Sequence, residues 1–526
     1  MVVDRWATPL LAPKAHVINS RSLEILRSVG IDNQRLRSRA TRLEDSRYVR
    51  FRSSLAGREY GKVLFERQDA DVLDFSPEPL LNIPQPQLEA LLADAVLNEP
   101  LVEIRRPCLW KSLTQNESGC VSVLEEGCEE YCFESRYVLG CDGAGSSVRD
   151  SLGITMDGQF GVQSCLTIHF RANLRHLVPD AEAMIYWVIN ENIAGALIAH
   201  DIDNEWVFLR FDAMNNGSMT PPEQVLEEEA RRTVLAAVGT GVDLEVLRMV
   251  PWTMNAQVAN KYRVGNVLLV GDAAHRFPPA GGLGVNTGFQ EAHNVAWKIA
   301  AVRAGWAGSE LLDTYEIERR RVAVANSEQS LSNINTAPRL AHAMVAASPH
   351  AKGELPKEVA YELAEAITSN AVTFDCFGLH LGFSYDPQRP LPTAPNIFVP
   401  RGESGDRLPH TWLKAGACQT PNRAIYDLLD PNAFTILASG QSDGIDAQAR
   451  LAFGAIPVHT VDVDHYKDIS PSWRQLVGLN RPGIVLVRPD GHILSKASGI
   501  GHEVLAAAAT KAQELCGEQA ASSEGR

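Results

Sequence analysis

The stretch from Arg263 to Lys298, RVGNVLLVGDAAHRFPPAGGLGVNTGFQEAHNVAWK, predicts the fold of the chain around it. It opens with the apolar run Asn266–Val270, which is short and rich in β-branched residues, as a buried strand requires. An acidic residue, two prolines and a glycine cluster come next. From Asn286 onward, apolar and small residues recur at helical spacing. The stretch therefore predicts a strand, a Gly-rich turn and a helix.

A strand that ends in a carboxylate, with glycines before a helix, suits the binding of a large polar ligand. Glycines let the backbone approach the ligand and expose its N–H groups. The helix N-terminus adds unpaired donors and partial positive charge, which stabilise an atom that gains negative charge. Asp272 is placed to bind a sugar or polyol hydroxyl. An ordinary Gly-rich βα turn would explain isolated glycines, but it does not explain the whole string.

The string resembles the second FAD-binding motif of the flavin-dependent aromatic hydroxylases, the group A flavoprotein monooxygenases. Their pattern is G-D-A-A-H, P-P, G-G-x-G-x-N-x-G and an acidic-Ala-x-Asn-x-x-Trp-Lys helix, with Glu291 here at a position that is usually Asp. The resemblance implies that Asp272 binds the ribityl chain and that Pro279 lies beside the flavin ring. It also implies that the following backbone faces the pyrimidine edge of the flavin: Gly282, Leu283, Gly284, Val285 and Asn286.

The N-terminal residues Met1–Asp4 have the pattern of a strand that closes on an acid. In a dinucleotide-binding βαβ unit the second strand ends on an acid that binds the ribose hydroxyls, a role that suits Asp4. The next segment, with a helix expected over Ser20–Val29, resembles that of the phenol and chlorophenol hydroxylases. By that resemblance Lys14 approaches the FAD pyrophosphate, although the position is usually Arg. His16 stands where those enzymes carry an acid near the substrate, and a base role or a structural role is open to it.

By the same comparison, roughly thirty residues of a βαβ unit, with the G-x-G-x-x-G turn, would precede Asp4. A shortened product and a natural variant without the main phosphate cradle are the two explanations. Either would weaken FAD binding, because the pyrophosphate would lose backbone hydrogen bonds and a helix dipole. The alternative to an enzyme is therefore a truncated, non-catalytic remnant that no longer holds FAD.

Two further motifs precede the central stretch. Gln85 opens a helix expected to run to about Ala95 and matches a family glutamine that hydrogen-bonds the cofactor; an exposed helix cap is an equal alternative. Asp142, in CDGAGSSVR, resembles the D-G motif that supports both FAD and the nicotinamide cofactor. The glycines Gly143 and Gly145 alone would be a weak fingerprint, because the third glycine is missing.

Residues 151 to about 260 carry strand-like segments and one helix, expected at Pro222–Val238, which fits an antiparallel sheet over the flavin and the substrate pocket. Short alternating strands between residues 102 and 139 indicate a β-meander. Three tryptophans are candidates for pocket walls, although burial in the core is the commoner outcome: Trp187, Trp206 and Trp252.

The predicted fold class is α/β: an FAD-binding Rossmann-like domain, incomplete at its N-terminus, an antiparallel-sheet substrate domain and a C-terminal domain that resembles the thioredoxin-like domain of the phenol hydroxylases. The expected ranges are 1–155 and 261–345 for the two parts of the FAD-binding domain, 156–260 for the substrate domain, 346–394 for a linker and helical segment, 395–516 for the thioredoxin-like domain and 517–526 for a disordered tail.

Charge and cysteine content narrow the class of protein. The formal charge of −15, from 49 basic and 64 acidic residues, argues against nucleic acid as the main partner. The nine cysteines form no C-x-x-C pair, so we expect no metal site, reduced thiols and a cytoplasmic location. No apolar run is long enough to span a bilayer.

The resemblance implies an FAD-dependent monooxygenase that uses NAD(P)H and O2 to hydroxylate a phenolic or polyketide-like aromatic compound through a flavin C4a-hydroperoxide. Epoxidation or Baeyer–Villiger oxidation by the same intermediate is an alternative within the family. The residues single out no catalytic group. The C-terminal domain is expected to serve packing or a homodimer.

Overall fold

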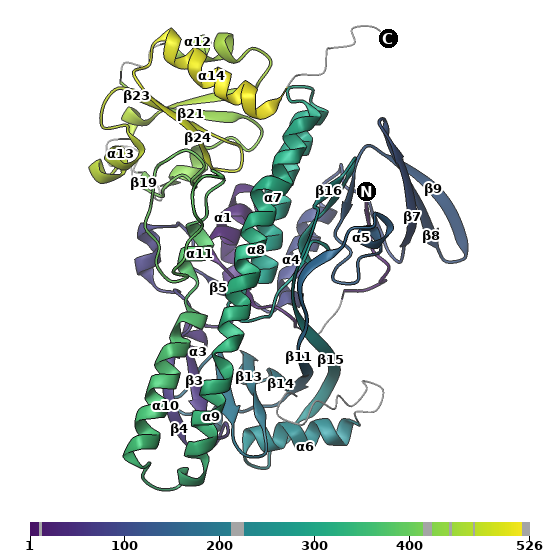
Figure 1. Ribbon diagram of the computed structural model, residues 1–526, viewed down its shortest axis with the longest axis vertical. Coiled ribbons are helices and arrows are strands. Elements are labelled where there is room, and N and C mark those ends of the chain that lie inside the picture. The colour runs from purple at the N-terminus through teal and green to yellow at the C-terminus, as the bar shows by residue number, and fades with distance from the viewer. Residues whose placement is uncertain (10–12, 212–225, 414–422, 441–443, 467–468, 518–526) are drawn as a thin grey trace.

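The computed structural model describes residues 1–9, 13–211, 226–413, 423–440, 444–466 and 469–517. Two long helices, α7 (Leu283–Arg303) and α8 (Asp313–Asn335), run side by side through the middle of the molecule (Figure 1). The sheets lie along these helices, and the C-terminal domain covers one end of them. The tail expected after residue 517 lies outside the described residues.

The strand predicted near the start of the central stretch is present as β17 (Val267–Leu269) and has a neighbour on each side. Strand β10 (Val138–Gly140) pairs in parallel with β17, which pairs antiparallel with β16 (Arg263–Val264). All three residues of β17 are buried, as its apolar run predicts. Because the carboxyl ends of parallel strands meet at one edge, the loops after β10 and β17 begin next to each other. A separate parallel pair joins β1 (Val2–Val3) to β6 (Ile104–Arg105).

The expected substrate sheet has eight strands in the order β18-β15-β11-β14-β13-β12-β3-β4, and it is antiparallel except that β12 pairs with β3 in parallel. One face packs on α6 (Glu227–Val238) in a large apolar cluster. The other face packs on α9 (Ala337–Ala347) and α10 (Lys357–Asn370). The first four residues of the helix expected at Pro222–Val238 lie outside the described residues. The strands are β18 (His275–Arg276), β15 (Glu245–Ala259), β11 (Met156–Arg171), β14 (Glu205–Phe211), β13 (Ala194–Asp201), β12 (Ile185–Ile189), β3 (Tyr48–Arg52) and β4 (Glu59–Leu64).

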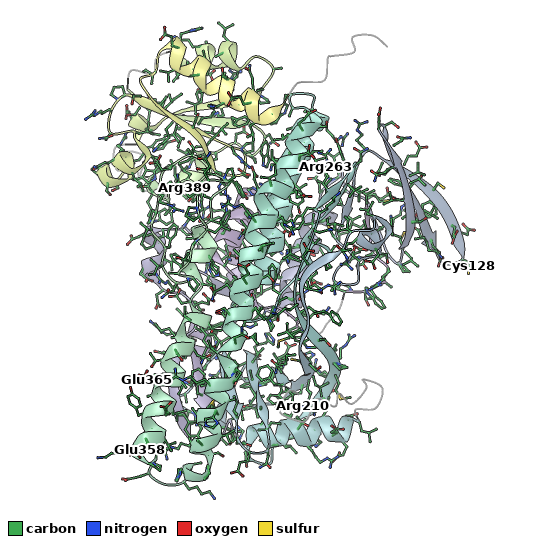
Figure 2. All side chains as sticks on the ribbon, in the orientation of Figure 1. Cys128, Arg210, Arg263, Glu358, Glu365 and Arg389 are labelled. Carbon is green, nitrogen blue, oxygen red and sulfur yellow. The ribbon has the colours of Figure 1, made fainter. Side chains whose placement is uncertain are left out.

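The smaller elements also follow the sequence patterns. Helix α1 (Ser20–Ser28) is capped by Asn19, whose side chain accepts the N–H of Ser22. Helix α4 (Gln85–Leu97) begins at the expected glutamine. The β-meander consists of β7 (Leu109–Asn116), β8 (Gly119–Glu126) and β9 (Glu129–Ser135), with Cys128 at its exposed end (Figure 2). The remaining early elements are β2 (Val17–Ile18), α2 (Asn33–Ser38), α3 (Leu43–Ser46), β5 (Leu81–Asn82) and α5 (Ser147–Ser151).

The C-terminal domain has the strand order β22-β21-β23-β24. Strand β21 (Phe434–Ser439) pairs in parallel with β22 (Val458–Asp462) and antiparallel with β23 (Gly483–Val487), which pairs antiparallel with β24 (Ile493–Ser498). A crossover helix, α12 (Ile445–Phe453), and a final helix, α14 (His502–Cys516), pack on this sheet. A βαβ unit followed by a β-hairpin and a helix is the thioredoxin-like arrangement that was predicted.

A buried charge network attaches this domain to the long helices. Arg488 donates to both oxygens of Glu318 and to Asp490, and Lys298 donates to Glu318 at 2.7 Å. The side chains are at most 6% exposed. The neighbouring cations overcome the effect of burial and lower the pKa of Glu318 to about 2. Each buried charge therefore depends on the others for compensation.

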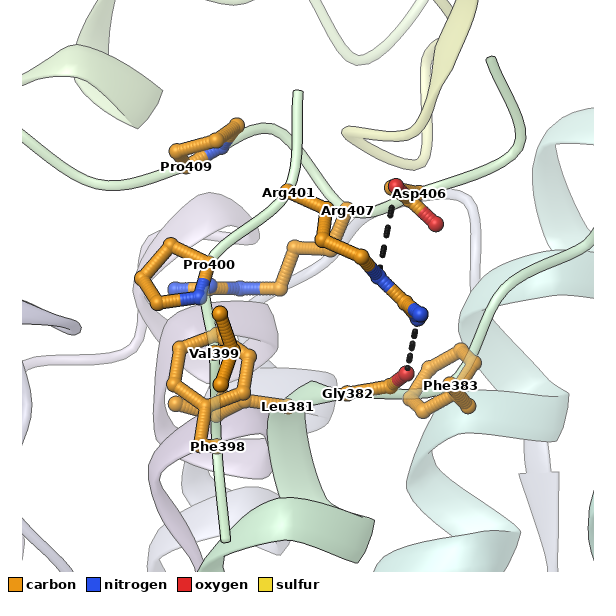
Figure 3. A pocket seen from close by; sticks show the side chains of 10 residues that line it. All are labelled: Leu381, Gly382, Phe383, Phe398, Val399, Pro400, Arg401, Asp406, Arg407 and Pro409. Carbon is orange, nitrogen blue, oxygen red and sulfur yellow. Dashed lines mark hydrogen bonds and ion pairs between the residues drawn. The ribbon is translucent and has the colours of Figure 1, made fainter. Parts of the chain in front are cut away.

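The chain between α11 (Phe377–Leu381) and the C-terminal domain is closely packed. Arg401 reaches across it to Asp406 and to the carbonyl oxygen of Gly382 (Figure 3). The cavity beside these side chains has a volume of about 10 Å³, which is room for one water molecule. This segment is a packed connection and not a ligand site. In the described part of the chain, no helix combines the length and the apolar character needed to cross a bilayer.

Candidate flavin and substrate site

The turn after β17 presents the acidic residue of the central stretch. A 3-10 turn, Gly271–Ala273, follows the strand, and β18 then adds His275 and Arg276 to the edge of the substrate sheet. Gly271 has φ +64°, a conformation that glycine adopts without strain. The side chain of Asp272 is exposed. The turn therefore holds a carboxylate out from the end of a buried strand, as the sequence predicts.

Glu291 fixes both ends of this turn from inside the protein. Its Oε2 accepts the backbone N–H of Gly271 at 2.8 Å and lies 3.1 Å from Nε2 of His275. The side chains of Glu291 and His275 have no exposed surface. In the sequence, Glu291 stands out only because the family usually has aspartate there. The structure shows that its carboxylate contacts Gly271 and His275, which explains why an acid is needed at this position.

The glycine cluster brings the helix start against another part of the chain. Gly282 has φ +61° and caps α7, and a Cβ there would lie 2.9 Å from Cβ of Val17. Helix α7 begins at Leu283, three residues before the helical spacing becomes visible in the sequence. The left-handed glycine at the N-cap explains the difference, because it starts the helix inside the glycine-rich segment. Pro279 is exposed just before this turn.

Asn286 connects α7 to α1. Its Oδ1 accepts the N–H of Asn19 at 2.9 Å and the hydroxyl of Ser22 at 2.7 Å. Its Nδ2 donates to the carbonyl oxygens of Val17 and Gly282. The side chain is thus committed to the protein, which leaves only its backbone for the flavin contact that the sequence predicts.

The D-G motif lies beside the turn. Both carboxylate oxygens of Asp142 accept local hydrogen bonds, one from Ser146 and one from the N–H of Val148. Arg149, on α5, donates to the carbonyl oxygen of Ala273 at 3.3 Å. The structure therefore brings Asp142 and Asp272 to one edge of the β10–β17 pair. The hydrogen bonds of Asp142 to Ser146 and Val148 stabilise the loop in which Asp142 lies.

Lys14 and Gln85 also come together. The Oε1 of Gln85 accepts the N–H of Ala15 at 3.3 Å, and the N–H of Gln85 donates to the carbonyl oxygen of Ala15. Lys14 is exposed next to this contact. Asp4 accepts the N–H of Trp6 and pairs with Arg106. None of the hydrogen bonds and ion pairs of the described residues joins Asp4 to residues 271–286.

The donor set of the turn fits a flavin nucleotide. Helix α7 has no side-chain cap, so its first N–H groups are available to a ligand. A Cβ added at the following glycines would meet no atom within 4 Å: Gly143, Gly145, Gly271 and Gly284. Open space beside small residues, an exposed carboxylate and unused N–H donors are what the ribityl chain and pyrimidine edge of FAD require.

His16 has a defined protonation state. Its Nδ1 lies 3.0 Å from Oδ1 of Asn82, and Nδ2 of Asn82 donates to Gln68. The asparagine oxygen faces the imidazole, so Nδ1 carries the proton and Nε2 keeps its lone pair. Burial lowers the pKa of His16 to about 4, so the ring is neutral at pH 7. The ring lies 5.6 Å from that of His200 on β13.

The face of the substrate sheet opposite α6 carries aromatic side chains. Trp252 lies opposite Cys165, which lies opposite Phe211, so these side chains share one face. The ring of Trp187 lies 5.4 Å from that of Phe211. These rings are half-buried, whereas Trp206, on the opposite face, is fully buried in the α6 cluster. The sequence pattern does not distinguish a tryptophan of the pocket wall from one of the core. The strand positions do, because they show on which face of the sheet each tryptophan lies.

This face also adjoins the flavin turn. Trp187 packs against an apolar cluster that contains Val17 and Phe51, and Val17 is the residue in contact with Gly282. The Nε1 of Trp252 donates to Thr167 on the neighbouring strand at 2.9 Å. The geometry thus places an aromatic wall on the same side of the molecule as the Gly-rich turn.

Comparison with known proteins agrees with this geometry. A family model described as FAD binding domain matches residues 1–330, and one described as Aromatic-ring hydroxylase, C-terminal, matches residues 401–516. The tetracenomycin A2 monooxygenase-dioxygenase of Streptomyces glaucescens is 30% identical, over 94% of this chain and 88% of that protein. The 4-methyl-5-nitrocatechol 5-monooxygenase of a Burkholderia species is also 30% identical, over 96% and 91%.

Among solved structures, the flavin-dependent monooxygenase PieE in complex with FAD and substrate has a TM-score of 0.87 at 27% identity, and the match covers 97% of this chain and 94% of that one. The fold and the site define an α/β flavoprotein with a thioredoxin-like C-terminal domain. The chain belongs to the FAD-dependent aromatic-ring hydroxylases, the group A flavoprotein monooxygenases. Their use of FAD and NAD(P)H, expected from the sequence, is confirmed at the level of the family, and no finding favours a non-catalytic remnant.

Proposed function

We propose that this chain hydroxylates a phenolic or polyketide-like aromatic compound on the face of the sheet that carries Trp187, Phe211 and Trp252. The observation that carries the proposal is that these half-buried rings share one face, and that this face adjoins the turn at Gly282 through Val17. An aromatic wall stacks on a planar substrate and excludes water from it. The names of the relatives, which include a nitrocatechol and a tetracenomycin monooxygenase, support an aromatic substrate.

The residues proposed to hold FAD are those of the sequence prediction. Asp272 binds the ribityl hydroxyls, Pro279 lies beside the ring, and the backbone from Gly282 to Asn286 donates to the pyrimidine edge. Lys14 is exposed for the pyrophosphate, and Gln85 holds the backbone next to it. Asp142 shapes the adjacent loop, and Asp4 is proposed for the ribose. When bound, FAD supplies the redox and oxygen-transfer chemistry; the protein supplies position and shielding.

His16 is proposed to orient a substrate hydroxyl. Its unprotonated Nε2 can accept a hydrogen bond, but its low pKa makes it a weak base toward a phenol, whose pKa is about 10. Orientation therefore suits His16 better than proton removal.

Three further expectations complete the proposal. The chain divides near the ranges predicted from its sequence, with residues 48–64 and 275–276 adding strands to the substrate sheet. It forms a homodimer through its C-terminal domain. The free thiols of the described chain support a reducing, cytoplasmic compartment: Cys108, Cys120, Cys128, Cys132, Cys141, Cys376 and Cys516.

A direct test compares aromatic substrates in the purified, FAD-reconstituted protein. NAD(P)H oxidation and product formation are measured with single-ring phenols and with hydroxylated polycyclic compounds. Coupled hydroxylation of at least one phenolic ring supports the proposal. NAD(P)H oxidation without hydroxylated product across both sets would contradict it.

A further inference from the structure

Glu66 has an unusual backbone conformation for its residue type. It follows β4 with φ +52°, and Asp180 is the only other non-glycine residue with positive φ in the described part of the chain. Side chains with a Cβ disfavour this region, and such residues persist where their surroundings hold them. Glu66 is also 7% exposed. A buried acid in a strained conformation needs specific partners.

Those partners lie in a three-residue segment that contacts Glu66 and the residue after it. The N–H of Glu66 donates to the carbonyl oxygen of Phe374 at 2.7 Å. The next residue, Arg67, pairs with Asp375 at 3.0 Å. The N–H of Cys376 then donates to Oε2 of Glu66 at 3.1 Å. Two consecutive residues after β4, Glu66 and Arg67, thus hold three consecutive residues before α11, and the Glu66 carboxyl completes the set.

Cys376 lies directly under the glycine-rich turn. Its side chain is fully buried and packs with Leu283 and Leu379. A Cβ at Gly281, where φ is +99°, would lie 3.1 Å from Sγ of Cys376. Beside Cys376, Nδ2 of Asn333 donates to the carbonyl oxygen of Ala280 at 3.4 Å. A shift of Cys376 would therefore move Gly281 and Leu283.

Burial favours the neutral form of Glu66. It is the main cause that raises the pKa of Glu66 to about 8; the carboxylate of Asp375 acts in the same direction, and the N–H of Cys376 and the charge of Arg67 oppose the shift. Burial and Glu66 together hold the pKa of the Cys376 thiol well above its usual value, so that thiol stays protonated. Glu66 is thus the group here that changes charge just above neutral pH.

We propose that Glu66 is a positioning residue that holds the Ala280–Leu283 turn through Cys376, and that its ionisation loosens the turn, because a buried carboxylate draws water into the packing around Glu66 and Cys376. The consequence for the cofactor rests on the proposed function, in which this turn faces the flavin. Glu66 acts through another residue and is not assigned contact with FAD or substrate.

Hydrogen exchange at the turn tests the first step without any flavin. Exchange at Gly281–Leu283 is compared between the wild-type chain and Glu66→Gln at about pH 6 and about pH 9, which cancels the intrinsic pH dependence of exchange. Glutamine keeps an oxygen for the N–H of Cys376 but does not ionise. We expect equal exchange at the lower pH and at least about fivefold faster exchange in the wild type at the higher pH. Equal rates at both pH values would overturn the proposal.

FAD titration tests the second step. The dissociation constant of the wild type should rise about fivefold or more between about pH 6 and about pH 9, while that of Glu66→Gln stays level. Asp71→Asn, an exposed acid in the following segment, is the matched control and should behave like the wild type. If exchange follows the expectation but neither protein binds FAD, the proposed function fails and the role of Glu66 stands. FAD affinity with the same pH dependence in Glu66→Gln would refute the link to the cofactor.

Discussion

The carboxylate of Glu291 lies 3.1 Å from Nε2 of His275, with both side chains fully buried at the base of the flavin turn. The same carboxylate accepts the N–H of Gly271. Asp272 lies between Gly271 and His275, so the orientation of its side chain depends on Glu291 of helix α7. The acid on α7 is therefore part of the binding turn, although it is not exposed to a ligand.

Replacing Glu291 should weaken FAD binding more than it disturbs the fold of the sheet. Glu291→Ala leaves the N–H of Gly271 and the imidazole of His275 without a buried acceptor, at a cost of about 1–3 kcal/mol. We expect FAD affinity to fall by about tenfold or more, measured by flavin fluorescence titration. Glu291→Gln, which still accepts one hydrogen bond, should retain more affinity; an alanine variant with wild-type affinity would exclude this role.

Substitutions at Gly282 and Gly284 should distinguish a glycine that the fold needs from a glycine that leaves room for FAD. Gly282→Ala forces a Cβ against Val17 at φ +61° and should lower the free energy of unfolding by about 1–3 kcal/mol. Gly284→Ala faces open space inside α7 and should not destabilise the protein, since alanine favours the helix. The same Cβ should reduce FAD affinity by about tenfold, because it occupies the proposed flavin site. Wild-type FAD affinity in Gly284→Ala would show that the flavin does not lie beside Gly284.

Two tryptophans of the substrate sheet should also differ, one affecting mainly the stability of the protein and the other mainly substrate binding. Trp206→Ala removes a fully buried ring and should cost about 3–5 kcal/mol of stability, measured by denaturant unfolding. Trp252→Ala removes a half-buried ring from the face opposite α6 and should mainly raise KM, by about tenfold, with a smaller change in Tm. An unchanged KM in a folded Trp252→Ala protein would place the substrate away from this wall.

The stability of the chain should depend on Glu66 in a pH window set by its two pKa values. The pKa is raised from 4.5 to about 8 on folding, so the folded state binds more protons in between. Its contribution is complete below about pH 4.5 and is lost as pH rises toward about 8, with a slope of about 1 kcal/mol per pH unit. The free energy of unfolding of the wild type, minus that of Glu66→Gln, should therefore fall over this range. A difference that rises with pH would contradict the shift.

The charge network at the C-terminal domain should respond asymmetrically to the loss of one partner. Arg488→Met leaves the buried carboxylates of Glu318 and Asp490 with fewer cations and should cost about 3 kcal/mol or more of stability. Arg450→Met breaks an exposed pair with Asp446 and serves as the control. Calorimetry of both variants decides the point, and equal melting temperatures would show that the network does not hold the domain.

The sequence predicted the elements better than the contacts between them. The strand at Val267–Leu269, the glycine turn and the helix carry local patterns that periodicity and residue type reveal. The helical spacing becomes visible only three residues after α7 begins, because a left-handed glycine at the N-cap has no hydrophobic period. The sequence does not show which tryptophan lines the pocket and which lies in the core, since that depends on the face of the sheet to which each strand position belongs.

The supporting side chains could not be found from the sequence alone. Asn286 meets Asn19 across 267 residues, and Glu66 meets Cys376 across 310. Such pairs depend on how the sheets and helices pack, and nothing local marks them. The flavin-facing roles of Asp4, Lys14 and Gln85 are still predictions, because they concern a ligand and not the folded chain.

FAD binding by the purified chain and by Asp272→Ala tests the central claim most directly. Apoprotein is titrated with FAD, the flavin spectrum is recorded, and NAD(P)H oxidation is then measured with and without a phenol. The wild type should bind FAD and oxidise NAD(P)H faster when the phenol is present, and Asp272→Ala should bind FAD at least about tenfold more weakly. A wild-type chain that acquires no flavin spectrum, or an Asp272→Ala variant with undiminished FAD affinity, would contradict the account.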